Sequence, residues 1–276
     1  MNAGAYETLD VRADGGVLHV TLNRPQARNA MTMAMVRELR TVLADARAAG
    51  DVRVVVLRGA GGHFCAGADL KDIAAARMRA MQADDDKRPL EPSADPMAEI
   101  NAKFGELCVA WADTGLATVA VLEGTVMGGG FGLACVVDVA IASETAVFRL
   151  PETSLGVVPA QVGPFLVERL GYAETKRLAV TGGTLDARQA LALRLVHEVH
   201  PSDALDAALQ RVVGEILRCA PGAISATKAL LSRARFTPPV ELVHDAAAVF
   251  SRSAQSAEGV EGMAAFIAKR KPKWAP

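Results

Sequence analysis

Apolar residues along the chain fall into short runs typical of strands and longer stretches with helical spacing. Residues 17–22 (VLHVTL) alternate like a half-buried strand, whereas 52–57 and 117–122 are apolar runs, interrupted only by Arg53 and Thr118, that are typical of strands buried on both faces. Between the first two runs, Thr32 can cap a helix over 33–49, with apolar residues on one face. The pattern therefore predicts strands joined by helices.

The later segments extend this pattern and then change it. Helices are expected at about 69–81 and 97–113, separated by the charged, proline-containing segment 82–96, which we interpret as a mobile surface loop. The resulting order of strands and helices favours an α/β core with parallel strands. After residue 152 the pattern predicts short helices at 163–170, 174–180 and 187–193, a strand at 195–199, and an almost entirely helical stretch over 203–268.

Composition supports a large buried core and excludes several classes of partner. The 276 residues are 51% hydrophobic and 22% charged, with a formal net charge of −1. This balance gives no reason to expect nucleic acid or an anionic membrane as a partner. The four cysteines are scattered, and no basic leader or membrane-length apolar segment is visible. We expect a cytoplasmic protein with free thiols.

The candidate chemistry lies between residues 116 and 152. An apolar strand runs into the turn Gly128-Gly129-Gly130, a small-residue helix is expected over 131–137, and Glu152 follows. Glycines at such a turn let a ligand approach the main chain, and the helix start offers free N–H groups. A second glycine-rich strand exit contains Ala66-Gly67-Ala68-Asp69. If the two turns face each other, each can donate one N–H to the same oxygen and form an oxyanion hole.

Other common catalytic motifs are missing from the sequence. It contains no G-x-x-x-x-G-K-[ST], no G-x-G-x-x-G at the triple glycine and no G-x-S-x-G. The five histidines form no metal signature, and we expect structural roles for them. No metal and no separate cofactor are therefore expected.

Five segments in the same order resemble the crotonase, or enoyl-CoA hydratase/isomerase, superfamily over essentially the whole chain. They are LNRPQARNAM, VRVVVLRGAGGHFCAGADLKD, EGTVMGGGFGL, RLPETSLGVVP and EGMAAFIAKRKPKW. The resemblance implies a crotonase (ClpP/crotonase-like) α/β spiral of ββα units over 1–200 and a helical trimerisation and CoA-capping region over 201–276. It also implies acyl-CoA thioester substrates, with coenzyme A as part of the substrate, and a homotrimer or dimer of trimers.

The resemblance assigns roles to individual residues. Ala68 and Gly129 match the two N–H donors to the thioester oxygen, and Glu152 matches a catalytic glutamate. Family contacts to coenzyme A map to Gln26, Ala27, Arg28, Ala66, Asp69 and Leu70, with Phe250, Phe266 and Lys269 closing over the nucleotide, in some members from a neighbouring subunit.

One position departs from the best-known hydratases, which hold a water between two glutamates. The first of these falls at Gly132, which has no side chain to hold water. Either Glu152 alone moves a proton between carbons, as in single-glutamate Δ3,Δ2-enoyl-CoA isomerases, or it is the principal acid/base of a hydration. In the second case another carboxylate could assist, and Glu123 and Asp113 are weak candidates. Ala160-Gln161-Val162 replaces glycines found in many hydratases, which should reshape the acyl end of the pocket.

The detailed match favours hydration of a branched substrate. The segments GGGFGLACVVDVAIA and LPETSLGVVPAQ and the terminus KRKPKWA are most similar to isohexenylglutaconyl-CoA hydratases, with methylglutaconyl-CoA hydratases next. These substrates carry their own carboxylate, for which Arg149 is a weak candidate partner. We therefore expect an enoyl-CoA hydratase (a hydro-lyase). The alternatives are the isomerase and a weakly catalytic acyl-CoA-binding or RNA-binding relative, although the 4% aromatic content argues against RNA.

Overall fold

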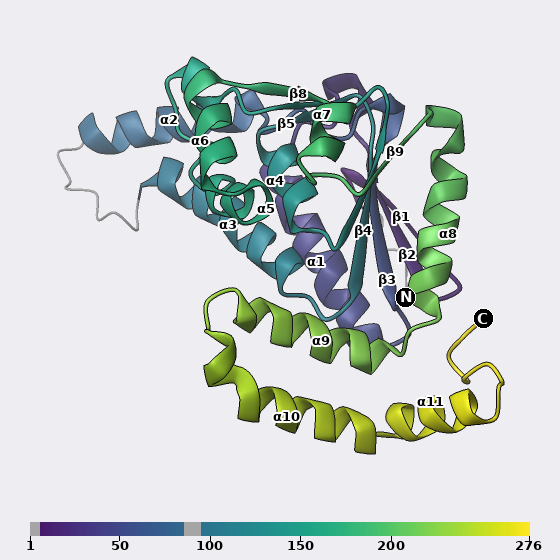
Figure 1. Ribbon diagram of the computed structural model, residues 1–276. Coiled ribbons are helices and arrows are strands. Elements are labelled where there is room, and N and C mark those ends of the chain that lie inside the picture. Colours follow the sequence, from purple (N-terminus) through teal and green to yellow (C-terminus); the bar gives the residue numbers. More distant parts are fainter. Residues whose placement is uncertain (1–5, 86–94) are drawn as a thin grey trace.

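A six-stranded sheet forms the centre of the computed structural model, which describes residues 6–85 and 95–276 (Figure 1). The strand order is β1-β2-β3-β4-β6-β9, antiparallel between β1 and β2 and parallel elsewhere. The strands are β1 (Leu9–Asp14), β2 (Val17–Leu22), β3 (Val54–Gly59), β4 (Ala117–Leu122), β6 (Val139–Ser143) and β9 (Glu198–His200).

Helices cover both faces of this sheet, which explains the continuous apolar runs. Val54 and Val56 of β3 pack in a cluster with α8 (Leu205–Leu217) on one face. The intervening Val55 and Leu57 belong to the larger cluster on the other face, which includes residues of α1 (Met33–Ala49), α3 (Pro96–Ala112) and α4 (Gly129–Val136). A strand between two apolar layers cannot alternate with polar residues.

A three-stranded sheet lies beside the first, at the carboxyl end of β4. It comprises β5 (Thr125–Met127), β7 (Val147–Arg149) and β8 (Thr184–Asp186), in that order. The chain leaves β4 of the large sheet, enters β5 of the small one and then forms α4, which is one ββα unit. The expected α/β architecture built from such units is therefore confirmed. Its consequence for the site is that α4 begins where the two sheets meet.

The remaining elements surround the core. They are η1 (Pro25–Ala27), η2 (Ala60–Gly62), α2 (Leu70–Asp85), η4 (Glu152–Leu155), α5 (Gly163–Leu170), α6 (Tyr172–Thr181), α7 (Ala187–Ala192), η5 (Ser202–Ala204), α9 (Pro221–Ala234), α10 (Pro239–Gln255) and α11 (Ala257–Ile267). Helices α9 to α11 form a layer below the core, beyond the amino ends of β3 and β4 (Figure 1). In the described part of the chain, no helix has both the length and the apolar character needed to span a bilayer.

Several predicted bounds hold and others need correction. α1, β2, β4 and α5 have the bounds predicted for them, and Thr32 caps α1 by accepting from the Met35 amide. The loop predicted over 82–96 is wrong at its start, because α2 continues to Asp85; residues 86–94 lie outside the described residues. The strand predicted over 195–199 begins only at residue 198, because the Leu195 amide instead bonds back to Ala190 at the end of α7.

Candidate functional site

The two glycine-rich turns lie against each other. Cys65 donates its amide to Thr125 O (3.0 Å) and accepts from the Met127 amide (2.9 Å), so the segment after β3 runs beside β5. A Cβ placed on Gly67 would lie 3.1 Å from the Met127 carbonyl oxygen and 3.7 Å from the Cα of Gly128. The two turns therefore face each other at close range, as a shared oxyanion hole needs.

The turn into α4 has a backbone shape that only glycine adopts easily. Gly128 has φ 51° and ψ −117°, a combination that sterically excludes side chains. Its amide donates to Arg149 O, which aligns the turn with β7. In the described chain no hydrogen-bond acceptor is found for the amides of Ala68 or Gly129, whereas Asp69 donates to Met31 O. Both candidate donors are therefore available to a ligand.

A short 3-10 turn holds Glu152 next to these glycines. η4 begins after Pro151 and ends at Gly156, whose left-handed conformation lets its amide cap the turn. Thr153 Oγ1 donates to Ala179 O at 2.6 Å and thereby fastens η4 to α6. The Glu152 backbone has little freedom as a result, and its side chain is directed at Gly128, where an added Cβ would lie 3.1 Å from Oε1.

The Glu152 carboxyl is set up for proton transfer. Its Oε2 atom is buried without a hydrogen-bond partner in the described part of the protein. Burial raises the pKa of Glu152, against the opposing effect of a backbone hydrogen bond. A carboxyl whose pKa rises toward neutral pH is suited to both accepting and returning a proton. The arrangement can thus combine two N–H donors with one acid/base group.

A second loop supports the Ala68 turn. Ala66 donates to Arg28 O, and Met31 donates to Gly67 O, so residues 24–31 pack beside residues 66–69. Arg24 Nη1 forms an ion pair with Asp69 Oδ2 at 2.8 Å. Burial alone would raise the pKa of Asp69, but hydrogen bonds from the Lys71 amide and from Arg24 lower it. Asp69 therefore stabilises the shape of the turn with its side chain.

The structure brings together only part of the predicted coenzyme A contacts. Five of them lie on the two adjoining segments 24–31 and 66–69: Gln26, Ala27, Arg28, Ala66 and Asp69; Leu70 begins α2, and its side chain is exposed. Phe250, Phe266 and Lys269 are exposed on or after α10 and α11, in the layer below the core and away from α4 (Figure 1). Within one chain, these last three do not reach the glycine turns.

Among the described residues, none of the positions considered for a second carboxylate places one beside Glu152. Gly132 lies in α4 against Phe104 and Val162. Glu123 forms an ion pair with Arg58, in which Oε2 of the glutamate lies 3.7 Å from Nη2 of the arginine. Asp113 precedes β4 and so lies at the opposite end of that strand from α4. Phe104 was not predicted as a site residue, because its apolar character in α3 does not distinguish it from an ordinary core residue.

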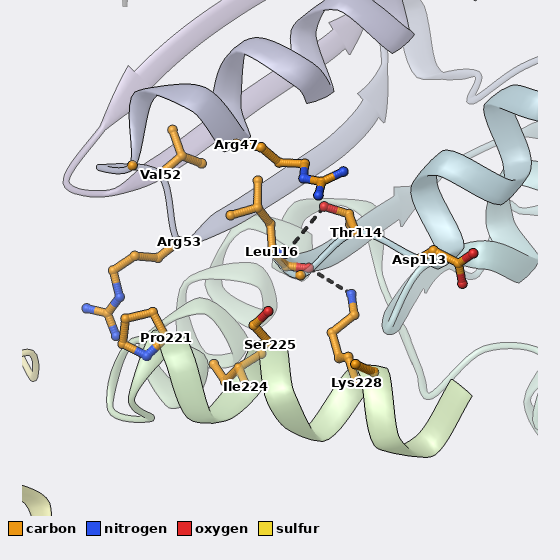
Figure 2. A pocket seen from close by; sticks show the side chains of 13 residues that line it. Arg47, Val52, Arg53, Asp113, Thr114, Leu116, Pro221, Ile224, Ser225 and Lys228 are labelled. Carbon is orange, nitrogen blue, oxygen red and sulfur yellow. Dashed lines mark hydrogen bonds between the residues drawn. The ribbon is translucent and has the colours of Figure 1, made fainter. Parts of the chain in front are cut away.

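Asp113 instead lines a cavity of about 370 Å³ between the core and α9 (Figure 2). The Lys228 amine there already donates to Leu116 O (2.7 Å) and to Asp138 (2.6 Å). None of the residues that line this cavity belongs to the candidate site. Among the described residues no cluster of three metal ligands occurs. The Cys65 thiol lies next to Gly130, and burial raises its pKa to about 12.

Comparisons with known proteins agree with this geometry. The family described as "Enoyl-CoA hydratase/isomerase" matches residues 12–276. A protein of Mycobacterium bovis named as a probable enoyl-CoA hydratase is 32% identical, covering 98% of each chain. The 2,3-dehydroadipyl-CoA hydratase of Escherichia coli is 31% identical and covers 93% of this chain and 94% of its own. Two solved structures cover 98% of this chain and 100% of their own: an enoyl-CoA hydratase/isomerase of Marinobacter aquaeolei (44% identity, TM-score 0.92) and AtuE of Pseudomonas aeruginosa (48%, 0.91).

Proposed function

This chain belongs to the enoyl-CoA hydratase/isomerase family, and we propose that it adds water across the double bond of an α,β-unsaturated acyl-CoA. The observation that carries the proposal is the buried carboxyl oxygen of Glu152 beside the Gly129 amide, both without a hydrogen-bond partner among the described residues. Only proton transfer and C–O bond formation are needed. The proposal therefore includes no cofactor, and coenzyme A enters as part of the substrate.

In the proposed reaction, the amides of Ala68 and Gly129 donate to the thioester oxygen. Glu152 takes a proton from water while the water oxygen bonds to C3, and the electron pair of the double bond moves onto the thioester as an enolate. Glu152 then returns the proton to C2, which completes the addition. Each preorganised donor to such an oxyanion lowers the activation free energy by about 3 to 4 kcal/mol.

Isomerisation is the second candidate, and one observation favours it. Gly132 has no side chain and faces Phe104, so position 132 offers no second carboxylate beside Glu152. One carboxylate suffices to remove a proton from C2 of a 3-enoyl thioester and to return it to C4. The two reactions separate cleanly, since hydration removes the ultraviolet absorbance of the conjugated thioester and isomerisation creates it.

The test replaces Glu152 by Gln, with Glu144→Gln as matched control on an exposed side chain at the end of β6. Glu152→Gln should lower kcat for crotonyl-CoA roughly 10²-fold or more, because the amide cannot exchange the proton. Glu144→Gln should retain the wild-type rate. Equal measurable rates for wild type and Glu152→Gln would exclude Glu152 as the acid/base, and binding without turnover in both would leave an acyl-CoA-binding protein as the better description.

For the substrate, we propose a branched glutaconyl-type thioester such as isohexenylglutaconyl-CoA. Support comes from the sequence similarity described above and from the E. coli relative, whose name specifies a dehydroadipyl, and so dicarboxylic, thioester. Arg149 is exposed on β7, and its carbonyl oxygen accepts a hydrogen bond from the Gly128 amide. It is therefore a candidate partner for the second carboxylate of the substrate. A higher kcat/KM for 3-methylglutaconyl-CoA than for crotonyl-CoA is expected, and the reverse order would contradict the proposal.

For the assembly, we propose that residues 201–276 associate with neighbouring copies in a trimer or a dimer of trimers. α10 and α11 leave large apolar side chains in solvent, including Phe250 (75% exposed), Phe266 (86%) and Ile267 (81%). Monomers rarely expose so many together. Sedimentation of the intact chain should give a multiple of three chains, and Phe266→Asp should shift it toward smaller species. A monomer at all concentrations would exclude the proposal, and with it nucleotide contacts from a neighbouring Phe266 and Lys269.

A further inference from the structure

The first turn of α4 has a flat face made by two glycines. Gly129 and Gly132 are three residues apart and so lie on the same side of the helix. The ring of Phe104 lies against both. A Cβ placed on Gly129 would be 3.3 Å from Cε2 and Cζ of the ring, and one placed on Gly132 would be 3.3 Å from Cζ. The ring thus occupies the space that a side chain at position 132 would need.

The surroundings hold the ring in place. Val162 Cγ2 would be 3.2 Å from a Cβ on Gly132, and Val162 is buried. The side chain of the preceding residue, Gln161, packs against Gly105 of α3. A Cβ added to Gly105 would be 2.1 Å from Gln161 Oε1. Gln161 and Val162 therefore pack against α3 and α4, respectively, and each contacts a glycine of its helix. The wall formed by Phe104 and Val162 joins α3, α4 and α5 and has little room to move.

This wall adjoins the reacting atoms if Gly129 binds the thioester oxygen, so the inference rests on the proposed function. Covalent bonds are about 1.2 to 1.5 Å long, which places C2 and C3 of the acyl group within a few ångströms of that oxygen. Phe104 is only partly buried, so part of this residue is accessible. A substituent on C3 that extends toward Gly132 must meet the ring.

We propose that Phe104 determines acyl specificity, by closing the Gly132 side of the pocket to bulky C3 substituents. The wall is apolar and replaces the carboxylate that two-glutamate hydratases have there. The preferred substrates are accordingly enoyl thioesters that present hydrogen or a small alkyl group to this side. Larger branches of a substrate must leave the site in another direction.

The test measures binding in a Glu152→Gln background, in which turnover should be roughly 10²-fold slower or more. The probes are crotonyl-CoA, with a methyl group on C3, and cinnamoyl-CoA, with a phenyl ring there, and the readout is the ratio of their Kd values by calorimetry. Phe104→Ala opens a space of the size of the added phenyl ring. It should shift the ratio toward cinnamoyl-CoA at least tenfold, since even one methylene group in a tight pocket is worth about 10 to 200-fold. Phe104→Leu should give a smaller shift, and Phe236→Ala, an exposed phenylalanine beyond α9, should give none.

A second pair of variants tests the contact itself. Gly132→Ala should weaken crotonyl-CoA binding several-fold when Phe104 is present, because the new methyl group displaces the ring, and should have a smaller effect in Phe104→Ala, where only Val162 opposes the methyl group. Such coupling is expected only between residues in contact. A ratio that stays within about twofold in both folded Phe104 variants overturns the inference alone. If the Glu152→Gln parent binds neither thioester, the proposed function itself falls.

Discussion

Gly130→Ala tests whether the close packing of the two glycine turns is required. Gly130 has no positive φ, so alanine suits its backbone, and only the surrounding space opposes the change. The added Cβ would lie 2.6 Å from Cys65 Cβ and 2.7 Å from Cys65 O. Carbon atoms prefer about 3.5 Å or more, so Cys65 and Gly130 must separate by roughly 0.9 Å. Both the amide and the carbonyl of Cys65 are hydrogen-bonded to β5, so Cys65 resists this displacement.

The expected cost follows from these distances. Overpacking a rigid core destabilises by about 1 to 3 kcal/mol, and each kcal/mol lowers the Tm of a chain of this size by roughly 2 to 4 °C. Calorimetry should therefore show a decrease of about 2 to 12 °C. Because the displaced segment leads directly into Ala68, the turnover of enoyl thioesters should also fall, by roughly 10²-fold for a displacement near 1 Å.

Gly214→Ala is the matched control. Gly214 lies within α8, has no positive φ, and an added Cβ would meet no atom within 4 Å. Alanine there should stabilise the chain by about 0.5 to 1 kcal/mol through helix propensity alone, without changing the rate. If Gly130→Ala matched Gly214→Ala in both Tm and rate, the two turns would not be rigidly packed, and the reasoning for a shared oxyanion site would be refuted.

Three further predictions concern the ionisable groups. Because burial raises the pKa of Glu152, the acidic limb of the kcat/KM profile should lie above the usual pKa of a glutamate, and a profile without that limb in the wild type would contradict Glu152 as base. The same raised pKa means that the folded state binds this proton more tightly, so its stabilising effect is complete below the unfolded pKa and is lost as the pH rises through the folded pKa. Glu152→Gln should therefore raise the Tm relative to wild type at neutral pH and lose that advantage in acid; a lower Tm at neutral pH would oppose this account. Arg24→Met leaves the buried Asp69 carboxylate without its ion-pair partner and should cost about 2 to 3 kcal/mol in urea denaturation above the unfolded pKa of Asp69, with a smaller loss in acid, where that carboxylate is protonated in any case. A loss independent of pH would show that the charge of Asp69 is not involved.

Local pattern was sufficient for the main elements of this protein. The apolar run of β4 and the capped, one-sided helix α1 were predicted with their observed bounds, because neighbours along the chain determine backbone hydrogen bonding and face. The short strands gave no such signal. β5 and β8 have three residues each and pair with β7, more than twenty positions away, whereas β1 alternates apolar with charged residues and pairs with the adjacent β2.

The candidate site shows the same division. Gly128, Gly129 and Glu152 were candidates from residue type and order, because a glycine turn before a helix offers free N–H groups to a ligand and a carboxylate follows it. That Ala68 and Gly129 both keep a free amide, and that Phe104 fills the space beside Gly132, depends on residues more than twenty positions apart meeting in space. Sequence alone thus determined which groups could do the chemistry. Only tertiary packing decided which of them meet and what shape of acyl group fits between them, because contacts between distant segments depend on how whole helices and strands pack.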